Sequence, residues 1–563
     1  MSPHNNASSH LEIIQVEDGA MNRLAAQNPD IIGMIERAKE ATRKEHEMTL
    51  MESLRLYPKA IIFSILLSCC IIMEGYDLNL MQGFFAFPPF QKKYGVKGLD
   101  GTYQITAAWQ SGLTNGAAVG EILGLFINGI ASERFGYRKT VLGSLFAVTC
   151  FVFILFFAEN VQTLEAGEIL CGIPWGVFQT LTTVYASEVC PVALRAYLTT
   201  FVNLCWVIGT LLGQGVLRGF LDRGDQWAYR IPFAVQWFWP VPIALGVIFA
   251  PESPWWLVRK GRNEDAKKAL LRLTSRNHPT FNADETIAMM IYTNELEKES
   301  AVGTSYLDCF KGVDLRRTEI ACTTWAIQNL SGSAFMGFST YFFEQAGLAT
   351  TNAFDMAMAQ YSLGAIGTIG SWFMMMRFGR RTLYLAGLST QFTILMITGF
   401  LALAPQTNKG ASWAIGGMLL AYTFVYDLTV GPVCYSLVPE IPANRLRTKT
   451  VVLARNTYNL IGLVNNVIIP RMLNPTAWNW KAKSGFFWAG LCFICAVWTY
   501  FRLPEPKGRT YGELDILFEN KVSARKFKTA VVDSFQRSST PLEEGMDEKE
   551  GTTATHLESR SEN

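Results

Sequence analysis

Charged side chains are scarce in this sequence. Asp, Glu, Lys and Arg together make up 17% of the 563 residues, against about 25% in an ordinary soluble domain. The formal net charge is only +2, so the chain lacks the clustered basic surface that a nucleic-acid-binding protein needs. These shortages argue against a soluble globular protein and against nucleic acid as a partner.

Histidine is also rare, and cysteine is not arranged for metal binding. The five histidines all stand in polar segments. Most of the eleven cysteines stand in apolar segments, without the paired CxxC spacing of a zinc site. No nucleophile stands next to a base, and no phosphate-binding loop is found. We therefore predict no metal, no cofactor and no enzyme activity.

Apolar residues, by contrast, are abundant and make up 50% of the chain. They form two long blocks separated by a polar segment. A membrane-spanning helix needs about 20 mainly apolar residues, so each block has room for six spans. The predicted fold class is an all-α polytopic membrane protein with twelve transmembrane helices in two six-helix lobes. The spans are expected near residues 60–80, 104–127, 140–158, 163–186, 197–217, 231–250, 318–343, 356–376, 383–404, 411–438, 449–470 and 484–503.

The polar segments complete a division into five parts. These are an N-terminal tail (1–58), an N-terminal lobe (59–250), a central insert (251–316), a C-terminal lobe (317–504) and a C-terminal tail (505–563). Lys and Arg accumulate in cytoplasmic loops, and their distribution here predicts that both tails and the insert are cytoplasmic. The N-terminal tail carries no secretion signal. The insert has an amphipathic helical pattern at 262–273, and the Ser-, Thr- and Glu-rich C-terminal tail is expected to be disordered.

Two pairs of similar segments recur six spans apart. The segment ERFGYRKT (133–140) resembles RFGRRTL (377–383), and YASEVCPVALR (185–195) resembles SLVPEIPANRLR (436–447). Each pair follows equivalent spans of the two apolar blocks. The repeats therefore indicate that the lobes are duplicated halves.

These segments also resemble a known family. Together with PESPWWL (251–257), GPVCYSLVPEIPANRLR (431–447) and PEPKGRT (504–510), they are similar to the sugar porter family of the major facilitator superfamily over about residues 58–520. MEGYD (73–77), CGIPWG (171–176) and STYFFEQAG (339–347) look most like fungal maltose and general α-glucoside permeases. The resemblance implies a monomeric transporter in the plasma membrane, with a sugar and a proton as partners and the lipid bilayer around it.

Ionisable side chains are few within the predicted spans, and each costs at least about 2.5–3.5 kcal/mol at membrane depth. One arginine, Arg455, cannot neutralise five acids, Glu74, Asp77, Glu121, Glu168 and Asp427. This excess favours proton coupling over the alternative of buried ion pairs that merely hold helices together. The resemblance makes Asp77 the proton acceptor, but Glu168 stands where the family has its partner arginine. The predicted proton-coupling residues are Glu74, Asp77, Glu121 and Glu168, with Arg455 as a counter-charge.

A sugar site needs planar amides that hydrogen-bond hydroxyl groups and aromatic faces that pack on the sugar ring. The resemblance places such groups at several spans, and Asn203 shares a polar stripe with Thr210 and Gln214. For each amide the alternative is a contact between helices. Asp427 could join the acids, line the cavity or precede a helix break at Gly431-Pro432. The predicted substrate-binding residues are Asn203, Gln328, Asn329, Asp427, Tyr435, Tyr458 and Asn459.

Charged residues of the repeated segments lie at the expected cytoplasmic ends of the spans. There they can form ion pairs that lock one conformation while the lobes rock about a central site, although positive charge is expected on that side in any case. The predicted gating residues are Glu133, Arg134, Arg138, Glu188, Arg195, Arg377, Glu440 and Arg447.

The function hypothesis is proton-coupled import of α-glucosides such as maltose by alternating access. A carrier for another sugar, such as trehalose, a raffinose-type oligosaccharide or a hexose, is the first alternative. A non-transporting sugar receptor is the second, and the short C-terminal tail argues against it.

Overall fold

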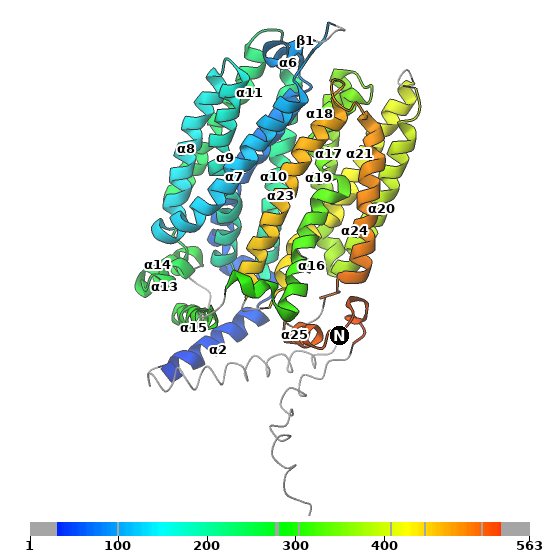
Figure 1. The fold of residues 1–563 in the computed structure, drawn as a ribbon. Coiled ribbons are helices and arrows are strands. Elements are labelled where there is room, and N and C mark those ends of the chain that lie inside the picture. Colours follow the sequence, from blue (N-terminus) through cyan, green and yellow to red (C-terminus); the bar gives the residue numbers. More distant parts are fainter. Residues whose placement is uncertain are drawn as a thin grey trace, which may run out of the picture.

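The computed structural model describes residues 31–97, 101–275, 281–301, 305–405, 408–443, 446–507 and 511–530. Within these ranges the chain forms two bundles of long helices side by side (Figure 1). The short helices that precede the first span, follow the sixth and follow the twelfth lie together at one end, here called the insert end. The predicted twelve-helix, two-lobe fold is confirmed.

The N-terminal lobe contains six spans, two of which are divided. The first span is α4 (Pro58–Ser68) continued by α5 (Cys70–Phe84), and the sixth is α11 (Trp227–Val235), η2 (Gln236–Phe238) and α12 (Pro240–Phe249). The four between them are unbroken: α7 (Ala107–Phe135), α8 (Tyr137–Phe157), α9 (Val161–Val189) and α10 (Val192–Phe220).

The C-terminal lobe also contains six spans, two of which are divided. Its first span is divided into α16 (Gly312–Gln328), a π-helical turn η4 (Asn329–Ser333), α17 (Ala334–Gly337) and α18 (Ser339–Gln345). Its fourth is divided into α21 (Lys409–Leu428) and α22 (Val430–Glu440). The unbroken spans are α19 (Thr350–Arg377), α20 (Arg380–Leu401), α23 (Arg447–Leu473) and α24 (Ser484–Arg502).

Hydropathy separates these spans into two groups. Among the described residues, nine helical segments are long and apolar enough to cross a membrane by length and composition. The other three spans, formed by α16 to α18, α19 and α23, are more polar. Polar side chains in a membrane span face the bundle interior or a water-filled cavity, so these spans are candidates for the lining of a site.

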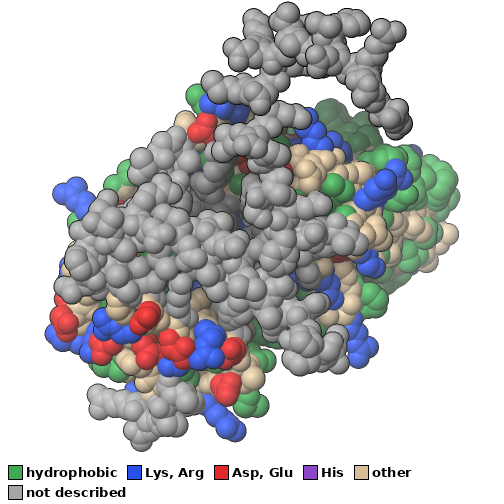
Figure 2. Space-filling view, turned by 90° about the horizontal axis from the view of Figure 1, so that it is seen from below, with side chains coloured by type: hydrophobic (Ala, Val, Ile, Leu, Met, Phe, Trp, Pro, Cys, Tyr) green, Lys and Arg blue, Asp and Glu red, His purple; other side chains and the backbone are tan. Residues whose placement is uncertain are grey.

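Short elements cover the two ends of the bundles. A helix, α6 (Pro88–Tyr94), and an antiparallel hairpin of β1 (Val96–Lys97) and β2 (Tyr103–Gln104) lie at the end opposite the insert. The insert end carries α2 (Ile31–Glu47), α3 (Leu50–Leu56), α13 (Pro254–Arg259), α14 (Asn263–Leu273), α15 (Ala283–Ala301), η3 (Tyr306–Phe310) and α25 (Tyr511–Glu519). Charged side chains gather on the described surface there (Figure 2).

The predicted amphipathic helix of the insert corresponds to α14. Its buried residues are Ala266, Ala269, Leu270 and Leu273, the i, i+3, i+4, i+7 spacing of one helix face. Its acidic residues Glu264 and Asp265 occupy the first turn, where their negative charges interact favourably with the positive end of the helix dipole.

The expectation of a disordered C-terminal tail is wrong for residues 511–530. The Phe518 and Phe527 rings lie 5.1 Å apart, and the Arg317 guanidinium lies 4.5 Å from the Phe518 ring. Arg316 donates a hydrogen bond of 3.0 Å to the Val522 carbonyl. Apolar and cation–π contacts thus dock this segment on the base of α16. Residues 531–563 lie outside the described part of the chain.

Helices α7 and α9 cross in close backbone contact. A Cβ on Gly120 would lie 2.1 Å from the Ile169 carbonyl oxygen, and one on Gly124 would lie 2.1 Å from that of Ile173. Small residues four apart allow membrane helices to approach in this way. The crossing brings Glu121 of α7 against α9, whose residues supply several neighbours of the buried acids.

The first span of the C-terminal lobe is not the continuous helix that the sequence predicts. Gly332 has a φ of 100°, a left-handed conformation that glycine adopts without strain. The Gln328 carbonyl accepts hydrogen bonds from the hydroxyls of Ser331, at 3.2 Å, and Ser333. Interrupted spans that expose backbone polar groups mark binding sites in transporters.

Candidate functional site

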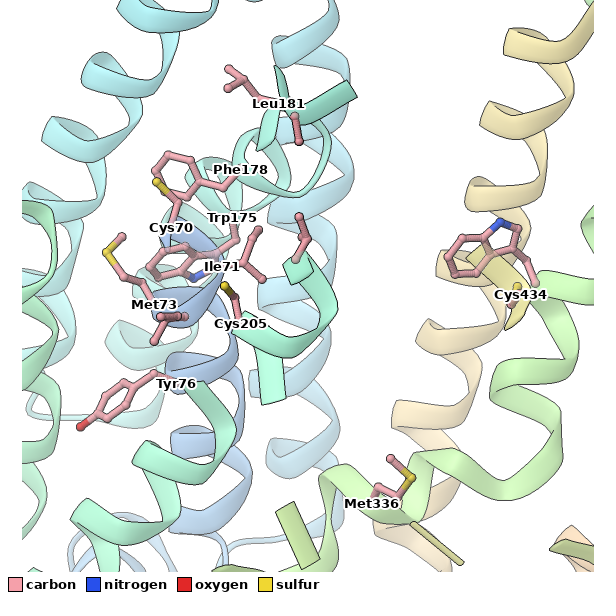
Figure 3. Packing of buried hydrophobic residues seen from close by; sticks show 14 of the residues in the cluster. Cys70, Ile71, Met73, Tyr76, Trp175, Phe178, Leu181, Cys205, Met336 and Cys434 are labelled. Atoms are coloured by element: carbon pink, nitrogen blue, oxygen red, sulfur yellow. The ribbon is translucent and has the colours of Figure 1, made fainter. Parts of the chain in front are cut away.

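Asp77 lies in the N-terminal lobe, on α5, and is fully buried. Its carboxylate accepts a hydrogen bond of 3.2 Å from Trp175 Nε1 and another from Gln236 Nε2. Trp175 itself is 1% exposed and packs among Cys70, Ile71, Cys205 and Phe178 (Figure 3). The apolar core thus fixes one of the two donors that orient this carboxylate.

Glu74 lies one turn before Asp77 and is connected to the opposite lobe. Its Oε1 accepts a hydrogen bond of 2.6 Å from Gln179 Nε2, and Gln179 Oε1 accepts one of 3.1 Å from Arg455 Nη2. The side-chain amide of Gln179 therefore stands between the acid and the arginine. It joins α5 and α9 of one lobe to α23 of the other.

Glu121 and Glu168 complete the group of buried acids. Glu121 lies beside Arg455 and Gln179, and its Oε1 is buried without a hydrogen-bond partner within the described residues. Glu168 is fully buried near Asp77, and neither of its oxygens has a partner there. The structure thus brings together all five residues predicted for proton coupling.

Arg455 does not form the direct ion pair that a counter-charge suggests, within the part of the chain described. Besides its bond to Gln179, its guanidinium lies 4.8 Å from the Trp325 ring and 4.7 Å from the Tyr458 ring. Cation–π contacts of this kind stabilise a buried guanidinium. Neither Gln179 nor Trp325 was predicted, because a single amide or indole in an apolar run looks like an ordinary core residue.

Aromatic side chains form a wall next to Arg455. The Trp325 ring lies 5.0 Å from that of Tyr435 and 5.3 Å from that of Tyr458, both edge-to-face. Tyr435 is 41% exposed, although it lies beside Arg455 in the middle of the protein. This exposure indicates an internal space at that depth.

Two of the predicted substrate-binding amides are occupied by protein contacts. Gln328 donates a hydrogen bond of 3.0 Å to the Gly431 carbonyl and accepts one of 3.2 Å from the Tyr426 hydroxyl. Asn329 donates one of 2.9 Å to the Tyr458 carbonyl. Gln328 therefore joins the two broken spans and Asn329 joins η4 to α23, as the alternative interpretation of helix contacts requires.

The other predicted amides have free polar groups. Asn203 is half-buried, and no hydrogen bond of its side chain is found among the described residues. The Nδ2 of Asn459 is buried and unpartnered within those residues. Thr210 and Gln214, which share the predicted polar stripe with Asn203, do have protein partners. Thr210 donates to the Val207 carbonyl and Gln214 donates to Asn79.

Asp427 lies on α21, apart from Arg455, and packs against α19. A Cβ on Gly364 would lie 2.7 Å from its Oδ2, and one on Gly367 would lie 3.2 Å from its Cβ. Span ten breaks at Thr429, two residues after Asp427. The sequence leaves three interpretations of Asp427 open. The structure favours the one in which it precedes a helix break.

Hydrogen bonds join the two lobes at the end opposite the insert. Asn79 donates to the Tyr361 hydroxyl at 2.6 Å, and Thr340 donates to Gln214 Oε1 at 2.9 Å. Arg218 and Asp355 form an ion pair of 2.7 Å. These contacts close the lobes together at that end.

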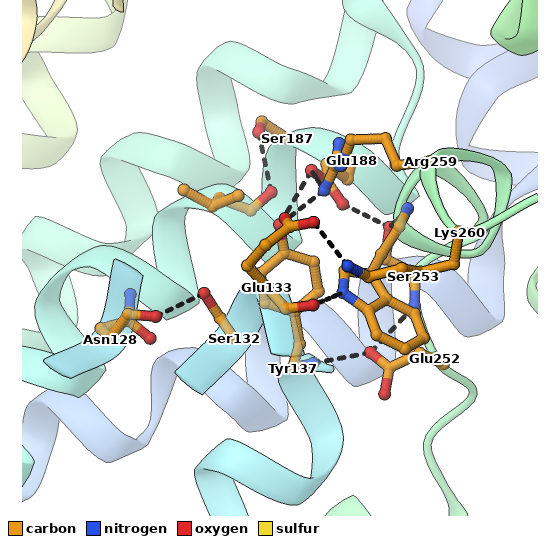
Figure 4. A network of polar contacts seen from close by, with 12 residues as sticks. Asn128, Ser132, Glu133, Tyr137, Ser187, Glu188, Glu252, Ser253, Arg259 and Lys260 are labelled. Carbon is orange, nitrogen blue, oxygen red and sulfur yellow. Dashed lines mark hydrogen bonds and ion pairs between the residues drawn. The ribbon is translucent and has the colours of Figure 1, made fainter. Parts of the chain in front are cut away.

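At the insert end, predicted gating acids of the N-terminal lobe pair with the insert (Figure 4). Glu188 lies 2.8 Å from Arg259, and Glu133 lies 2.7 Å from Lys260. The Tyr137 hydroxyl donates to Glu188 at 3.0 Å and accepts from Arg259 at 3.0 Å. Tyr137 therefore belongs to the same network.

The predicted gating residues thus meet partners that the sequence analysis did not name. In the C-terminal lobe Glu440 pairs with Arg380 at 3.1 Å. Arg138 donates to the Ile248 carbonyl, and Arg134 stacks on Phe135 at 5.5 Å. Arg195 and Arg447 have contacts within the protein, and Arg377 is exposed at the end of α19.

Two acids that sequence reasoning missed stand at equivalent places in the lobes. Glu252 accepts a hydrogen bond of 2.9 Å from the Tyr137 backbone N–H, and Glu505 accepts one of 2.8 Å from that of Arg380. Each caps a helix start, where N–H groups lack partners. Burial raises the pKa of Glu252, and the backbone N–H groups offset part of this rise. The repeated Pro-Glu at 251–252 and 504–505 was the available signal.

Replacing Glu505 with alanine is expected to destabilise the protein by about 0.5–2 kcal/mol, the usual cost of losing a helix cap. Glu505→Gln keeps one oxygen acceptor and should lose less. Thermal unfolding of the purified protein, followed by tryptophan fluorescence, measures both. Equal unfolding temperatures for Glu505→Ala and the wild type would contradict the capping role.

Comparison with known proteins agrees with this architecture. The family described as sugar (and other) transporter matches residues 63–518. A general alpha-glucoside permease of Saccharomyces cerevisiae is 43% identical over 516 residues, which cover 91% of this chain and 83% of that protein. A maltose permease of the same yeast is 43% identical over 514 residues, covering 90% and 83%.

Solved structures share the fold at low sequence identity. The proton:xylose symporter XylE bound to 6-bromo-6-deoxy-D-glucose matches with a TM-score of 0.65 and 20% identity, covering 82% of this chain and 100% of that one. The inward open form of XylE from E. coli matches with a TM-score of 0.65 and 18% identity, covering 81% and 99%. With the family match across most of its length and these relatives, the chain belongs to the family of sugar (and other) transporters, whose members are transporters and not enzymes.

Proposed function

We propose that this protein imports α-glucosides, such as maltose, together with protons across the plasma membrane. The observation that carries the proposal is the group of four buried carboxylates, two of which, Glu74 and Glu121, lie near the Arg455 guanidinium, next to an aromatic wall. Ionised carboxylates without partners are costly to bury, and a single arginine can balance the charge of only one of the four. Protons are the mobile charges that balance the rest.

The substrate class rests on the chemistry of the wall and on the relatives. Tyr435, Tyr458 and Trp325 offer aromatic faces suited to sugar C–H surfaces. Asn203 and Asn459 offer amide groups free to bond hydroxyls. The relatives at 43% identity are named for α-glucosides and maltose, which favours a di- or oligosaccharide over a hexose.

Alternating access follows from contacts at the two ends. The described hydrogen bonds between Asn79, Gln214, Thr340 and Tyr361 hold the lobes together at the end opposite the insert. At the insert end, Glu188 and Glu133 pair with the insert and Glu440 pairs within its own lobe. With tails and insert in the cytoplasm, these contacts favour an inward-facing state of a monomer whose lobes rock about the central site.

Uptake of labelled sugars by cells lacking their own permeases tests the proposal. Maltose uptake should rise as the external pH falls and should cease when a protonophore collapses the gradient. Glucose, trehalose and raffinose serve as comparison substrates. Uptake of a hexose alone, or uptake of maltose independent of pH, would overturn the proposed substrate or the proposed coupling respectively.

Asn203→Ala is expected to raise the KM for maltose about two- to tenfold, with little change in maximal rate. A lost hydrogen bond of this kind is worth about 0.5–1.5 kcal/mol, and about 1.4 kcal/mol corresponds to tenfold. Initial-rate uptake gives both constants. Asn128→Ala, whose amide bonds Thr180 at 2.7 Å near the insert end, is the control, and equal KM values in the two variants would place the sugar elsewhere.

The variant Gln328→Ala distinguishes a role of Gln328 in sugar binding from a role in helix contact. Because Gln328 already bonds Gly431 and Tyr426, we expect the variant to lower both thermal stability and maximal uptake rate, with a smaller change in KM than Asn203→Ala. A rise in KM with unchanged unfolding temperature would restore Gln328 to the substrate-binding set.

A further inference from the structure

A basic hollow lies where the N-terminal lobe meets the insert. It has a volume of about 250 Å³ between the start of α8 and helices α13 and α14. Two acids, Glu252 and Asp265, share its lining with five bases, Arg138, Lys139, Arg262, Lys268 and Arg272. Bases exceed acids, so an anionic group fits this hollow.

Most of the acidic charge in the hollow is already engaged. Glu252 caps the start of α8, and Asp265 pairs with Arg262 at 2.8 Å and with Lys268 at 3.6 Å. Arg272 donates to a neutral group, the Phe249 carbonyl, at 2.7 Å. Lys139 is exposed and has no hydrogen bond or ion pair with any described residue. The bases therefore keep capacity to bind an anion.

An apolar hollow adjoins the basic one on the flank of the lobe. It has a volume of about 320 Å³ between α7, α8 and α9, and Ile127, Ile173 and Val177 contribute to its lining. Phe135 and Lys139 line both hollows. A Cβ on Gly143, which lies in the apolar hollow, would meet no atom within 4 Å. The two hollows thus form one site with an apolar part and a basic part.

We propose that this site binds an anionic phospholipid of the membrane leaflet at the insert end. The phosphate-bearing headgroup lies in the basic hollow, and an acyl chain lies along α8 in the apolar hollow. Lys139 stands at the junction, where a glycerophosphate lies between the two parts of a lipid. Basic pockets at helix ends on the cytoplasmic side bind lipid headgroups by the same charge attraction. The proposal rests on the membrane fold and is independent of the sugar transported.

Native mass spectrometry of the full-length protein in detergent tests this site. The probes are dioleoyl phosphatidylinositol 4-phosphate, phosphatidylserine and phosphatidylcholine, each titrated separately. The two anionic lipids should bind more tightly than phosphatidylcholine. Because each surface Lys or Arg contributes about fivefold, the double variant Lys139→Ala/Lys268→Ala should bind the inositol lipid about 25-fold more weakly.

Two further variants separate the parts of the site. Gly143→Phe fills the open space of the apolar hollow and should weaken binding of every phospholipid. Lys59→Ala removes an exposed lysine at the start of α4, which lines neither hollow, and should leave binding unchanged. Lys268→Glu, on an exposed side chain, remains informative if the double variant is poorly folded.

Three outcomes would overturn the proposal. Equal affinity for anionic and neutral lipids removes the basic hollow as the determinant. Unchanged binding in the double variant and in Lys268→Glu places the lipid elsewhere. Binding of inositol 1,4-bisphosphate as tight as that of the lipid, with no effect of Gly143→Phe, identifies a site for a free anion instead.

Discussion

Replacing Arg455 with leucine is expected to abolish sugar accumulation against a gradient while leaving downhill movement measurable. An arginine side chain is always charged, and this one meets Gln179 at 3.1 Å across the lobes, with Glu74 bonded to the other side of the same amide. A proton that neutralises one of the acids weakens the attraction between the lobes. Leucine removes this link, so proton binding no longer biases their rocking.

Vesicles with imposed pH and potential gradients measure the loss. One charge moved through 100 mV is worth about 2.3 kcal/mol, or about 40-fold accumulation, and Arg455→Leu should lose it. Two controls separate charge from geometry. Arg455→Lys keeps the charge without the planar fork and should retain part of the accumulation. Gln179→Leu removes only the bridging amide.

Arg455 also makes packing contacts, and these would be present even if its role were purely structural. The guanidinium stacks on Trp325 and Tyr458 at 4.8 and 4.7 Å, so leucine also removes packing. Potential-driven accumulation with an unaltered pH profile in Arg455→Leu would show a structural anchor. Trp325→Phe, which keeps an aromatic face at this place, should preserve coupling if charge is what matters.

The sequence predicts the spans well because hydrophobic length is a local property. The fourth span, expected at 163–186, is α9 at Val161–Val189. The π-helical turn after Gln328 was not predicted, because its stability depends on partners from other helices. Tyr422 donates to the Ser331 carbonyl at 2.9 Å, and Asn465 donates to that of Asn329 at 3.0 Å. Such bonds exist only after α21 and α23 have packed.

The residues of the candidate site also differ in how well the sequence predicts them, depending on whether the signal is local or tertiary. Carboxylates in apolar runs, such as Asp77 and Glu168, stand out in the sequence because their burial is costly. Gln179 and Gln236 do not, since a neutral amide in a span has many ordinary uses. Glu133 and Glu188 were predicted to form ion pairs but their partners were not, because Arg259 and Lys260 lie in an insert whose docking is set by tertiary contacts.

The acids themselves are tested by Asp77→Asn and Glu121→Gln, each of which keeps the size of the side chain and removes the group that exchanges protons. Both variants should lose uphill accumulation and the alkaline shift that accompanies sugar entry, while exchange of sugar persists because the aromatic wall and Asn203 are intact. Asp77 already accepts bonds from Trp175 and Gln236, so asparagine can keep the bond from Gln236.

The matched control is Glu344→Gln, because Glu344 is another buried carboxylate, on α18, and its hydroxyl partner is Thr350 at 3.1 Å. If burial of any carboxylate affected coupling, this control would lose accumulation as well. If only Glu74, Asp77, Glu121 and Glu168 exchange protons, it should accumulate sugar like the wild type. An unchanged alkaline shift in both Asp77→Asn and Glu121→Gln would mean that these acids serve helix packing and that protons, if coupled, enter by another route.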